Sequence, residues 1–193
     1  MLKFEKVTKQ NVVAAIRVQN SIFPSKHADA YIYNTIDGHP LPWVAWEELW
    51  LAKVDEEVIG ITGLWTLNGC PKDAWIDWFG VVEQHRRKGF ATQMFNFIKK
   101  TAQQLGFENL RVWTDDKDNS ESVAFYQKQC MDIEIYANKD DVHLQKGNTV
   151  ILSLGLNEEV APKWENKNLH LKQLYQTLEN HDPTCYSDKI PPS

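Results

Sequence analysis

Residues 75–92 read WIDWFGVVEQHRRKGFAT. The stretch begins as an apolar, aromatic segment typical of a buried strand, continues as a basic loop, and ends in the first turn of an amphipathic helix. The first turn of a helix has backbone N–H groups without internal partners at the positive end of the helix dipole, so it attracts anions. Gly89 lets the backbone approach an anion closely, Ala91 keeps the next position small, and the basic run at 86–88 adds positive potential. Together these features predict a pyrophosphate site.

The order of residues in the loop separates the classes of pyrophosphate ligand. The nucleoside triphosphate loop requires Gly-Lys followed by Ser or Thr, whereas here Lys88 precedes Gly89. The dinucleotide fingerprint requires three glycines, and the second is missing. The pattern Arg86-x-x-Gly89-x-Ala91 instead resembles the acyl-CoA loop of the GNAT superfamily of N-acetyltransferases, which reads Arg/Gln-x-x-Gly-x-Gly/Ala. A solvated basic turn is the alternative interpretation of the same residues.

A second stretch, one predicted strand downstream, carries the same resemblance. Residues 119–128 read NSESVAFYQK, which is similar to the family pattern Asn-x-x-Ala-x-x-x-Tyr-x-Lys. The chain departs from the family at Ser122, where Ala is usual, and at Cys130-Met131, where Gly-Phe is usual. The resemblance covers residues 2–156 and implies a GNAT-like, mostly antiparallel central sheet with helices on both faces.

The resemblance implies direct transfer of an acetyl group from acetyl-CoA, as cosubstrate, to a primary amine in a ternary complex. Tyr126 would lie near the thioester sulfur and protonate the departing thiolate, which a phenol with a pKa of ~10 can do if the site favours transfer. The alternative is a core tyrosine whose hydroxyl bonds to the backbone. A backbone N–H near Val81, where the family's strand splays from its neighbour, would polarise the thioester carbonyl. The implied cofactor contacts are Phe79, Val81, Arg86, Arg87, Lys88, Gly89, Phe90, Ala91 and Thr92, with Asn119 near the pantetheine arm.

The general base that deprotonates the amine has two candidates. Asp77 is a carboxylate inside an apolar strand, where an unpaired charge is costly and the pKa tends to rise. A paired structural Asp, or one that faces solvent, is the alternative. Strict alternation would put Asp77 on one face with Trp75 and Phe79, so that one pocket could hold all three. Glu83, at the end of the strand, is the second candidate.

The remaining pattern predicts a mixed α/β plan rather than a fully parallel sheet. The expected strands are 2–7, 46–54, 58–67, 74–82, 110–113, 131–136 and 149–156, and the expected helices are one capped by Thr8, a short one within 26–42, one over 90–105 and one opened by the capping box Asp118 and Glu121. Residues 1–156 form the predicted acetyltransferase domain. Residues 157–193 form a predicted extension that contains an amphipathic helix over 164–178 and a polar tail. The helix could pack on the sheet or form a homodimer, and the sequence does not decide between these alternatives.

Composition excludes several classes of protein. A net charge of −5 and a pI of about 5.7 argue against nucleic-acid binding, which needs a broad basic face. No apolar run suits a membrane span or a signal peptide, and three cysteines without metal-ligand spacing favour a reducing compartment, so a cytoplasmic protein without a metal site is expected. The acceptor, a small-molecule or peptide amine, is not readable from the sequence. The other function classes left open are a CoA-binding regulatory module without turnover and an interaction protein that uses the C-terminal helix.

Overall fold

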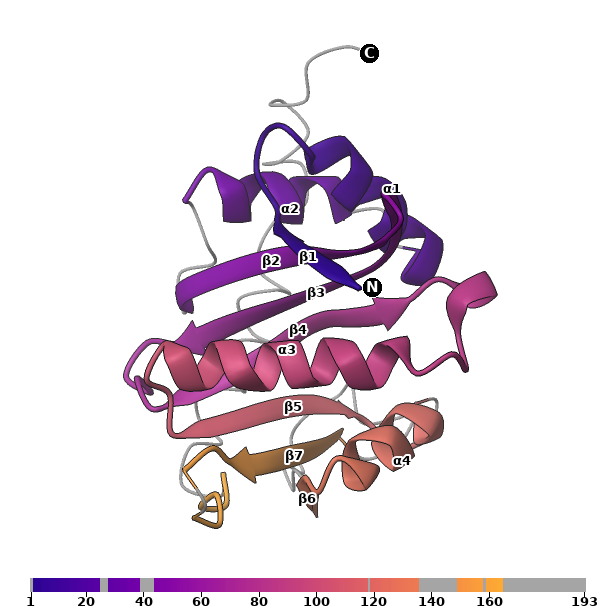
Figure 1. Ribbon diagram of the computed structural model, residues 1–193. Coiled ribbons are helices and arrows are strands. Elements are labelled where there is room, and N and C mark those ends of the chain that lie inside the picture. The colour runs from indigo at the N-terminus through magenta and orange to yellow at the C-terminus, as the bar shows by residue number, and fades with distance from the viewer. Residues whose placement is uncertain are drawn as a thin grey trace.

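The computed structural model describes residues 2–24, 28–38, 44–117, 119–135, 149–157 and 159–164. Within these ranges the strands are β1 (Lys3–Lys6), β2 (Val44–Val54), β3 (Glu57–Leu67), β4 (Asp73–Val81), β5 (Asn109–Asp115), β6 (Asp132–Ile135) and β7 (Thr149–Gly155). The helices are α1 (Val12–Ile22), α2 (Ala28–Ile36), α3 (Phe90–Gln104), α4 (Ser120–Lys128) and the short 3-10 helix η1 (Glu83–His85). The strands form one sheet in the order β1-β2-β3-β4-β5-β7-β6 (Figure 1). Across the described ranges, no helix is both long and apolar enough to cross a membrane.

The sheet divides between β4 and β5. These two strands are parallel, whereas the other pairs in the sheet are antiparallel. Their pairing joins Asp73–Trp75 to Asn109–Arg111, although β4 continues to Val81 and β5 to Asp115. Beyond Trp75, the edge of β4 that faces β5 therefore has no partner strand among the described residues. The mixed, mostly antiparallel sheet predicted from the sequence is confirmed.

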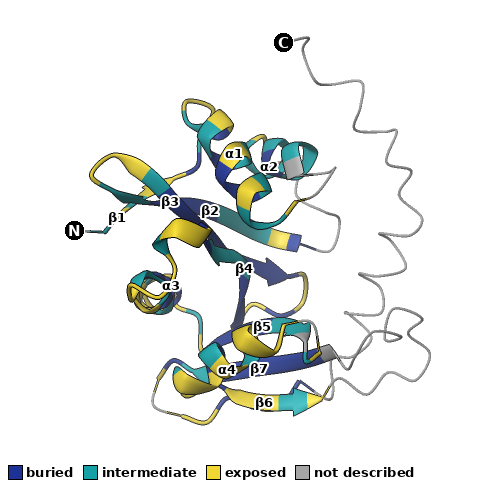
Figure 2. Cartoon of the chain, turned by 90° about the vertical axis from the view of Figure 1, so that its right-hand side faces the viewer, coloured by how far each residue is buried: buried dark blue, intermediate teal, exposed yellow. Residues whose placement is uncertain are grey.

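Helices cover both faces of the sheet, as predicted. On one face, α3 and α4 pack through Phe95 and Tyr126 on a core that includes Leu152 of β7. On the other face, α1 and α2 pack on a core that includes Ile32 and Leu51. Figure 2 shows α1 and α2 on the opposite side of the strands from α3. Side chains that point in opposite directions from the same strand therefore contact different helices.

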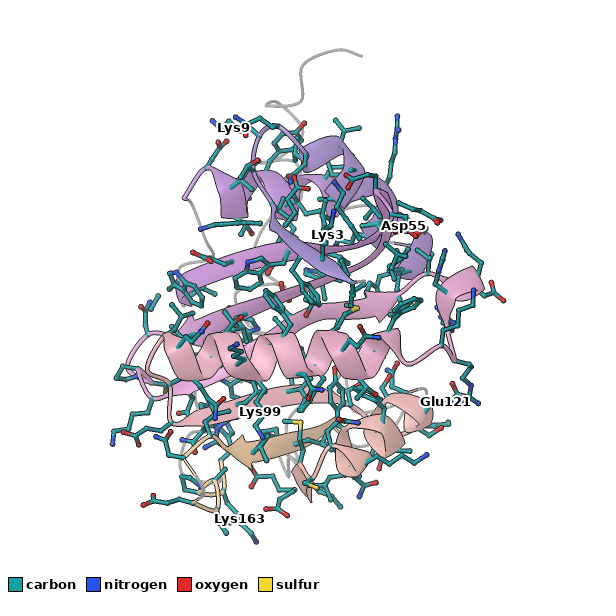
Figure 3. All side chains as sticks on the ribbon, viewed as in Figure 1. Lys3, Lys9, Asp55, Lys99, Glu121 and Lys163 are labelled. Atoms are coloured by element: carbon teal, nitrogen blue, oxygen red, sulfur yellow. The ribbon has the colours of Figure 1, made fainter. Side chains whose placement is uncertain are left out.

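A two-residue turn joins β2 to β3. Asp55 and Glu56 have φ values of 47° and 69°, so both central residues lie in the left-handed region. Positive φ at both positions matches the turn whose twist suits a tight hairpin. Asp55, labelled in Figure 3, is exposed at this turn. The strands predicted over 46–54 and 58–67 are thus joined as a tight hairpin, although acidic residues occupy a turn that usually favours Asn and Gly.

Two helix starts differ from the prediction. Thr8 does not cap α1: the N-cap is Asn11, and the Thr8 amide donates to Asn11 Oδ1 at 2.8 Å. Thr8 belongs to a separate turn, because its carbonyl accepts from the Asn11 amide at 3.2 Å. α4 begins at Ser120 with Asn119 as its N-cap, one residue later than the predicted capping box requires, and Asp118 lies outside the described residues.

A buried ion pair connects the middle of the sheet to the C-terminal segment. Arg111 and Asp73 are both fully buried, and Arg111 Nε donates to Asp73 Oδ1 at 2.8 Å. The rest of the guanidinium donates to Ser153 Oγ at 2.7 Å and to the Pro162 carbonyl at 2.9 Å. Its carbon centre lies 5.2 Å from the ring centroid of Trp164, within the range of a cation–π interaction. These partners therefore take the place of the water molecules that would hydrate an exposed guanidinium group.

Trp164 belongs to the core of the protein. Its ring is fully buried and meets the ring of Trp75 edge-on at 4.8 Å between centroids. Its amide donates to Glu134 Oε1 at 2.6 Å. The packed structure thus continues past Leu156 as far as Trp164. The predicted helix over 164–178 and the polar tail otherwise lie outside the described residues.

Candidate active site

A β-bulge interrupts β4 where the site begins. Gly80 pairs with Ile61 and Asp77 pairs with Gly63, so two residues of β4, Trp78 and Phe79, face one residue of β3. Trp78 has a φ of 39°, which a bulky side chain adopts only when the surrounding structure imposes it. The extra residue changes which face each following side chain of β4 occupies.

The bulge makes the predicted common pocket for Trp75, Asp77 and Phe79 wrong. The Trp78 ring lies 5.6 Å from that of Tyr31 on α2, whose hydroxyl donates to Asp77 Oδ2 at 2.8 Å. Asp77 and Trp78 therefore both lie on the α1–α2 face. Phe79 points to the other face, and Trp75 packs in a separate cluster with Trp164. Alternation fails at Phe79 because the bulge inserts one residue after Asp77, whereas Trp75 lies before the bulge and packs away from Asp77 in its own cluster.

Phe79 and Tyr126 meet on the α3–α4 face. Their ring centroids are 5.8 Å apart, and Phe125 and Phe95 contact the same rings. Burial raises the pKa of the Tyr126 phenol above its usual value, so the hydroxyl keeps its proton. Its hydroxyl forms no hydrogen bond to a described residue, so the alternative of a backbone-bonded core tyrosine finds no support there. The bulge thus separates an aromatic half-site with one phenol from a half-site with carboxyl groups.

The basic loop connects β4 to α3 through η1. Gly89 is the N-cap of α3 with a φ of 79°, and a Cβ built there meets no atom within 4 Å. Arg87 also has a positive φ, 61°. Arg86 Nε donates to the Val81 carbonyl at 3.0 Å, which ties the start of the loop back to the end of β4. The helix start predicted at Phe90 is confirmed.

The main chain of this loop leaves a run of amides unpaired. Within the described ranges, none of the N–H groups from Arg87 to Thr92 donates to another protein group; the first intrahelical bond of α3 runs from the Gln93 amide to the Gly89 carbonyl at 3.2 Å. Arg87 and Lys88 are exposed beside them. Six consecutive donors at a helix N-terminus, with two cations adjacent, are the arrangement that attracts anions such as phosphate groups.

The carboxyl group of Asp77 lies close enough to that of Glu47 on β2 for the two groups to influence each other's pKa. Glu47 Oε2 also accepts a hydrogen bond from Thr35 Oγ1 at 2.8 Å. Asp77 accepts a hydrogen bond from the Tyr31 hydroxyl, and the backbone amide of Trp78 also acts on its carboxylate. Sequence reasoning missed Glu47, although its alternation with the buried Leu49 offered a signal, because nothing local indicates that β2 and β4 bring these two carboxyls together.

Gly63 of β3 makes room for the carboxyl pair. β3 lies between β2 and β4, and a Cβ at position 63 would lie 2.6 Å from Leu49 Cδ2 and 3.2 Å from the Cβ of Asp77. A side chain there would have to push these neighbours away. Glycine therefore leaves the gap across which Glu47 and Asp77 meet.

Burial favours the protonated form of the carboxyl pair. Burial raises the pKa of Asp77 well above its usual value, while hydrogen bonds from Glu47 and the Trp78 amide act in the opposite direction. Burial also raises the pKa of Glu47, and the charge of Asp77 and the hydrogen bond to it raise it further. The ion pairs found among the described residues include neither group. Two carboxyls in contact without a cation share a proton, as in other carboxyl dyads.

The other predicted site residues lie apart from this pair. Glu83 is the first residue of η1 and is exposed, and its carboxylate has no hydrogen bond or ion pair to a described residue. Asn119 is exposed at the N-cap position of α4. The structure brings Asp77, and not Glu83, into contact with the Tyr31 hydroxyl on α2.

We expect the carboxyl pair to make the protein less stable as the pH rises. The folded pair keeps a proton that the unfolded chain releases above a pH of about 4, so the free energy of unfolding falls between that pH and the raised pKa of the pair, by up to about 1.4 kcal/mol per pH unit for one proton. In the double variant Glu47→Gln/Asp77→Asn this loss is absent. Urea unfolding at pH 5 and pH 8 should show the variant gaining about 1–3 kcal/mol on the wild type over that interval. A difference that stays constant with pH would contradict the shared proton.

Comparison with known proteins identifies one family. The model of the acetyltransferase (GNAT) family matches residues 14–130, a span that includes β4, the basic loop and α4. A comparison with curated protein sequences finds no match.

Solved structures share the fold at low sequence identity. A GNAT family acetyltransferase from Elizabethkingia anophelis with acetyl-CoA bound is 19% identical over 80% of this chain and 97% of its own, with a TM-score of 0.60. A Bacillus subtilis acetyltransferase in complex with CoA is 21% identical over 80% and 99%, with a TM-score of 0.59. The ribosomal-protein-S18-alanine N-acetyltransferase from Escherichia coli is 10% identical over 82% and 96%, with a TM-score of 0.61.

Proposed function

The chain belongs to the GNAT family of acetyltransferases, and from this premise we propose that it moves an acetyl group from acetyl-CoA to a primary amine. The observation that carries the proposal is the run of unpaired amides from Arg87 to Thr92 at the start of α3. The bound acetyl-CoA and CoA in two neighbours of the same fold support a donor of this kind.

The donor would lie across the split in the sheet. The six amides and the exposed Arg87 and Lys88 would hold its pyrophosphate. Beyond Trp75, the edge of β4 on the β5 side has no strand partner among the described residues, so the pantetheine amides can pair with main-chain groups near Phe79 as an added strand would. Asn119, at the N-cap of α4, stays a predicted contact of the pantetheine arm.

The two half-sites on either side of the bulge divide the chemistry. The acceptor arrives as an ammonium ion and must lose a proton before its nitrogen can attack the thioester, and Asp77 would take that proton directly or through water. Because its pKa is raised, the carboxylate is a stronger base at neutral pH than an ordinary aspartate. A main-chain N–H near Val81 would stabilise the negative charge that develops on the thioester oxygen. Tyr126 would hydrogen-bond and protonate the sulfur as its bond to the acetyl carbon breaks.

Two measurements test the proposal. Acetyl-CoA at about 100 times its dissociation constant should add about 2.7 kcal/mol to the free energy of unfolding. Release of CoA thiol from acetyl-CoA should then depend on one or more members of a panel of amines, amino acids and peptides. Stabilisation by acetyl-CoA without thiol release for any amine would favour the alternative of a CoA-binding module, and no stabilisation at all would refute both.

We expect the variant Tyr126→Phe to lower kcat about 10- to 100-fold, the usual range for a lost proton donor. KM for acetyl-CoA should change little, because the hydroxyl has no hydrogen bond to a described residue whose loss would disturb the fold. Steady-state thiol release measures both constants. A variant with wild-type kcat would remove Tyr126 from the mechanism and leave it as a packing residue of the aromatic half-site.

A further inference from the structure

We propose that Glu47 passes the proton taken up by Asp77 into a cavity on the far side of the carboxyl pair, so that Glu47 and Asp77 work as a proton relay. This inference rests on the proposed function, because it concerns the proton that the acceptor amine must lose. It makes Glu47 a positioning and relay residue that touches the base rather than the substrate.

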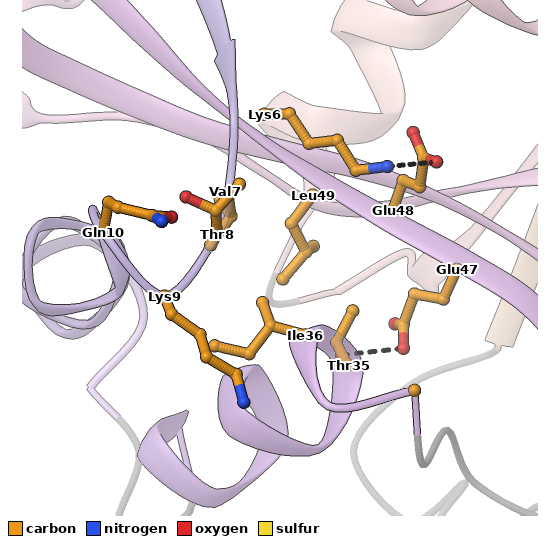
Figure 4. Close-up of a pocket in the computed structure, with 11 residues that line it drawn as sticks. Lys6, Val7, Thr8, Lys9, Gln10, Thr35, Ile36, Glu47, Glu48 and Leu49 are labelled. Carbon is orange, nitrogen blue, oxygen red and sulfur yellow. Dashed lines mark hydrogen bonds and ion pairs between the residues drawn. The ribbon is translucent and has the colours of Figure 1, made fainter.

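The cavity lies against the outer strands of the sheet. Its volume is about 390 Å³, and its walls come from the segment between β1 and α1, the end of α2, and β2. Figure 4 shows Glu47 and Thr35 meeting at its wall, while the neighbouring Glu48 points to the other side of β2 toward Lys6. Asp77 does not line the cavity. Glu47 is thus the group of the pair that reaches this space.

The route crosses the face of the sheet in one direction. Asp77 is on β4, next to the bulge and the split where the reaction would occur. Glu47 is two strands away on β2, and it contacts Asp77 across the gap left by Gly63. The cavity begins on the outer side of Glu47. A proton that moves from Asp77 to Glu47 therefore leaves the reaction centre without crossing the acceptor or the thioester.

The groups around the carboxyl pair are neutral donors and lysines that already have other partners. Tyr31 and Thr35 of α2 are neutral donors to the two carboxyls. The nearby lysines already have partners: Lys6 Nζ lies 2.5 Å from a Glu48 oxygen, and Lys9 Nζ lies 2.8 Å from an Asp37 oxygen. Within the described chain, no cation is paired with Glu47 or Asp77 to hold both in the ionised state. The raised pKa values of both carboxyls agree with one retained proton.

The relay balances as one proton in and one proton out. In the resting pair, Glu47 carries the proton and Asp77 is ionised. The acceptor R–NH3+ gives one proton to Asp77 and becomes R–NH2, while Glu47 releases its own proton to a water molecule of the cavity. The pair then consists of Asp77 as the acid and Glu47 as the carboxylate. Transfer of the proton along the hydrogen bond between them restores the resting pair.

A spectroscopic experiment tests the shared proton without requiring turnover. Isotope-edited infrared spectra of the full chain with carbon-13 in the Asp and Glu carboxyls should contain the carbonyl stretch of a protonated carboxyl at pH 7. The band should be absent from Glu47→Gln and present in Glu48→Gln, the neighbour on β2 that pairs with Lys6. If wild-type protein shows only ionised carboxylates at pH 7, the relay is wrong.

A kinetic experiment tests the transfer. In Glu47→Gln, the amide can donate to Asp77 but cannot release a proton, so we expect kcat to fall at least 10-fold and the acid limb of its pH profile to move to lower pH. Glu48→Gln should keep the wild-type profile, and KM for acetyl-CoA should be unchanged in both variants. A uniformly lower kcat without movement of the limb would mean a structural role and overturn the relay, while wild-type turnover would preserve the proposed function. A wild type that acetylates none of the amines would overturn both.

Discussion

Glutamate at position 89 is expected to weaken the binding of acetyl-CoA at least 100-fold. The new carboxylate would lie among the amides proposed to hold the pyrophosphate, and two like charges about 5 Å apart at an effective dielectric constant of about 20 repel by about 3 kcal/mol, which corresponds to more than 100-fold in affinity. Steric overlap is not the cause, because a Cβ at Gly89 meets no atom within 4 Å. Isothermal titration with acetyl-CoA measures the effect.

Gly106 offers a matched control at the other end of α3. It has a φ of 84°, close to the 79° of Gly89, and a Cβ there also meets nothing within 4 Å. The variant Gly106→Glu therefore introduces the same charge and comparable backbone strain far from the loop. Its dissociation constant for acetyl-CoA should stay within about 3-fold of the wild-type value, less than 1 kcal/mol. Equal losses in the two variants would show that strain in α3, and not an anion site, explains the result.

The loop could be predicted from sequence because its determinants are local. The basic run, Gly89 and the apolar spacing of Met94, Phe95 and Ile98 mark the start and the buried face of one helix within a single stretch of chain. The hairpin turn is local in the same sense. Such features depend on the periodicity and on a few backbone conformations, which neighbouring residues determine.

The bulge at Trp78 could not be predicted in this way. Neither Trp78 nor Phe79 is a glycine, and nothing in their own sequence announces an extra residue. The bulge is defined only by the register of β4 against β3, where two residues face Thr62. As a result, the sequence indicated Asp77 as a candidate base, but alternation wrongly placed Phe79 on the same face.

The contacts of Glu47 and Arg111 depend on still longer-range pairing. Glu47 meets Asp77 only because β2, β3 and β4 are adjacent and because Gly63 leaves a gap between them. The sequence around Arg111 indicates only a short strand, whereas the partners of Arg111 come from β4, β7 and the segment after β7. Charged groups inside a sheet are specified by strand order, which single-strand patterns do not contain.

The variant Arg111→Met is expected to lower the free energy of unfolding by about 3–5 kcal/mol, the usual cost of removing one partner of a buried ion pair. Asp73 would then remain fully buried without its guanidinium partner, although the Asn109 side chain still donates to it at 3.0 Å. The Pro162 carbonyl and the face of Trp164 would also lose their partner, so the C-terminal segment would loosen together with the sheet. Equilibrium unfolding in urea, followed by tryptophan fluorescence, measures the loss.

A neighbouring ion pair and a second substitution separate charge burial from a loss of packing. Lys72 precedes Asp73 in sequence and pairs with Glu108 at 2.8 Å, but both side chains are largely exposed, so Lys72→Met should destabilise the protein much less than Arg111→Met. Adding Asp73→Asn to Arg111→Met removes the buried charge that has lost its cation and should restore part of the lost stability. If the double variant is no more stable than Arg111→Met, the cost comes from packing against Trp164. Because a well-packed neutral pair can equal a buried ion pair in stability, recovery would mean that Arg111 chiefly neutralises Asp73 while it holds residues 159–164 against the sheet.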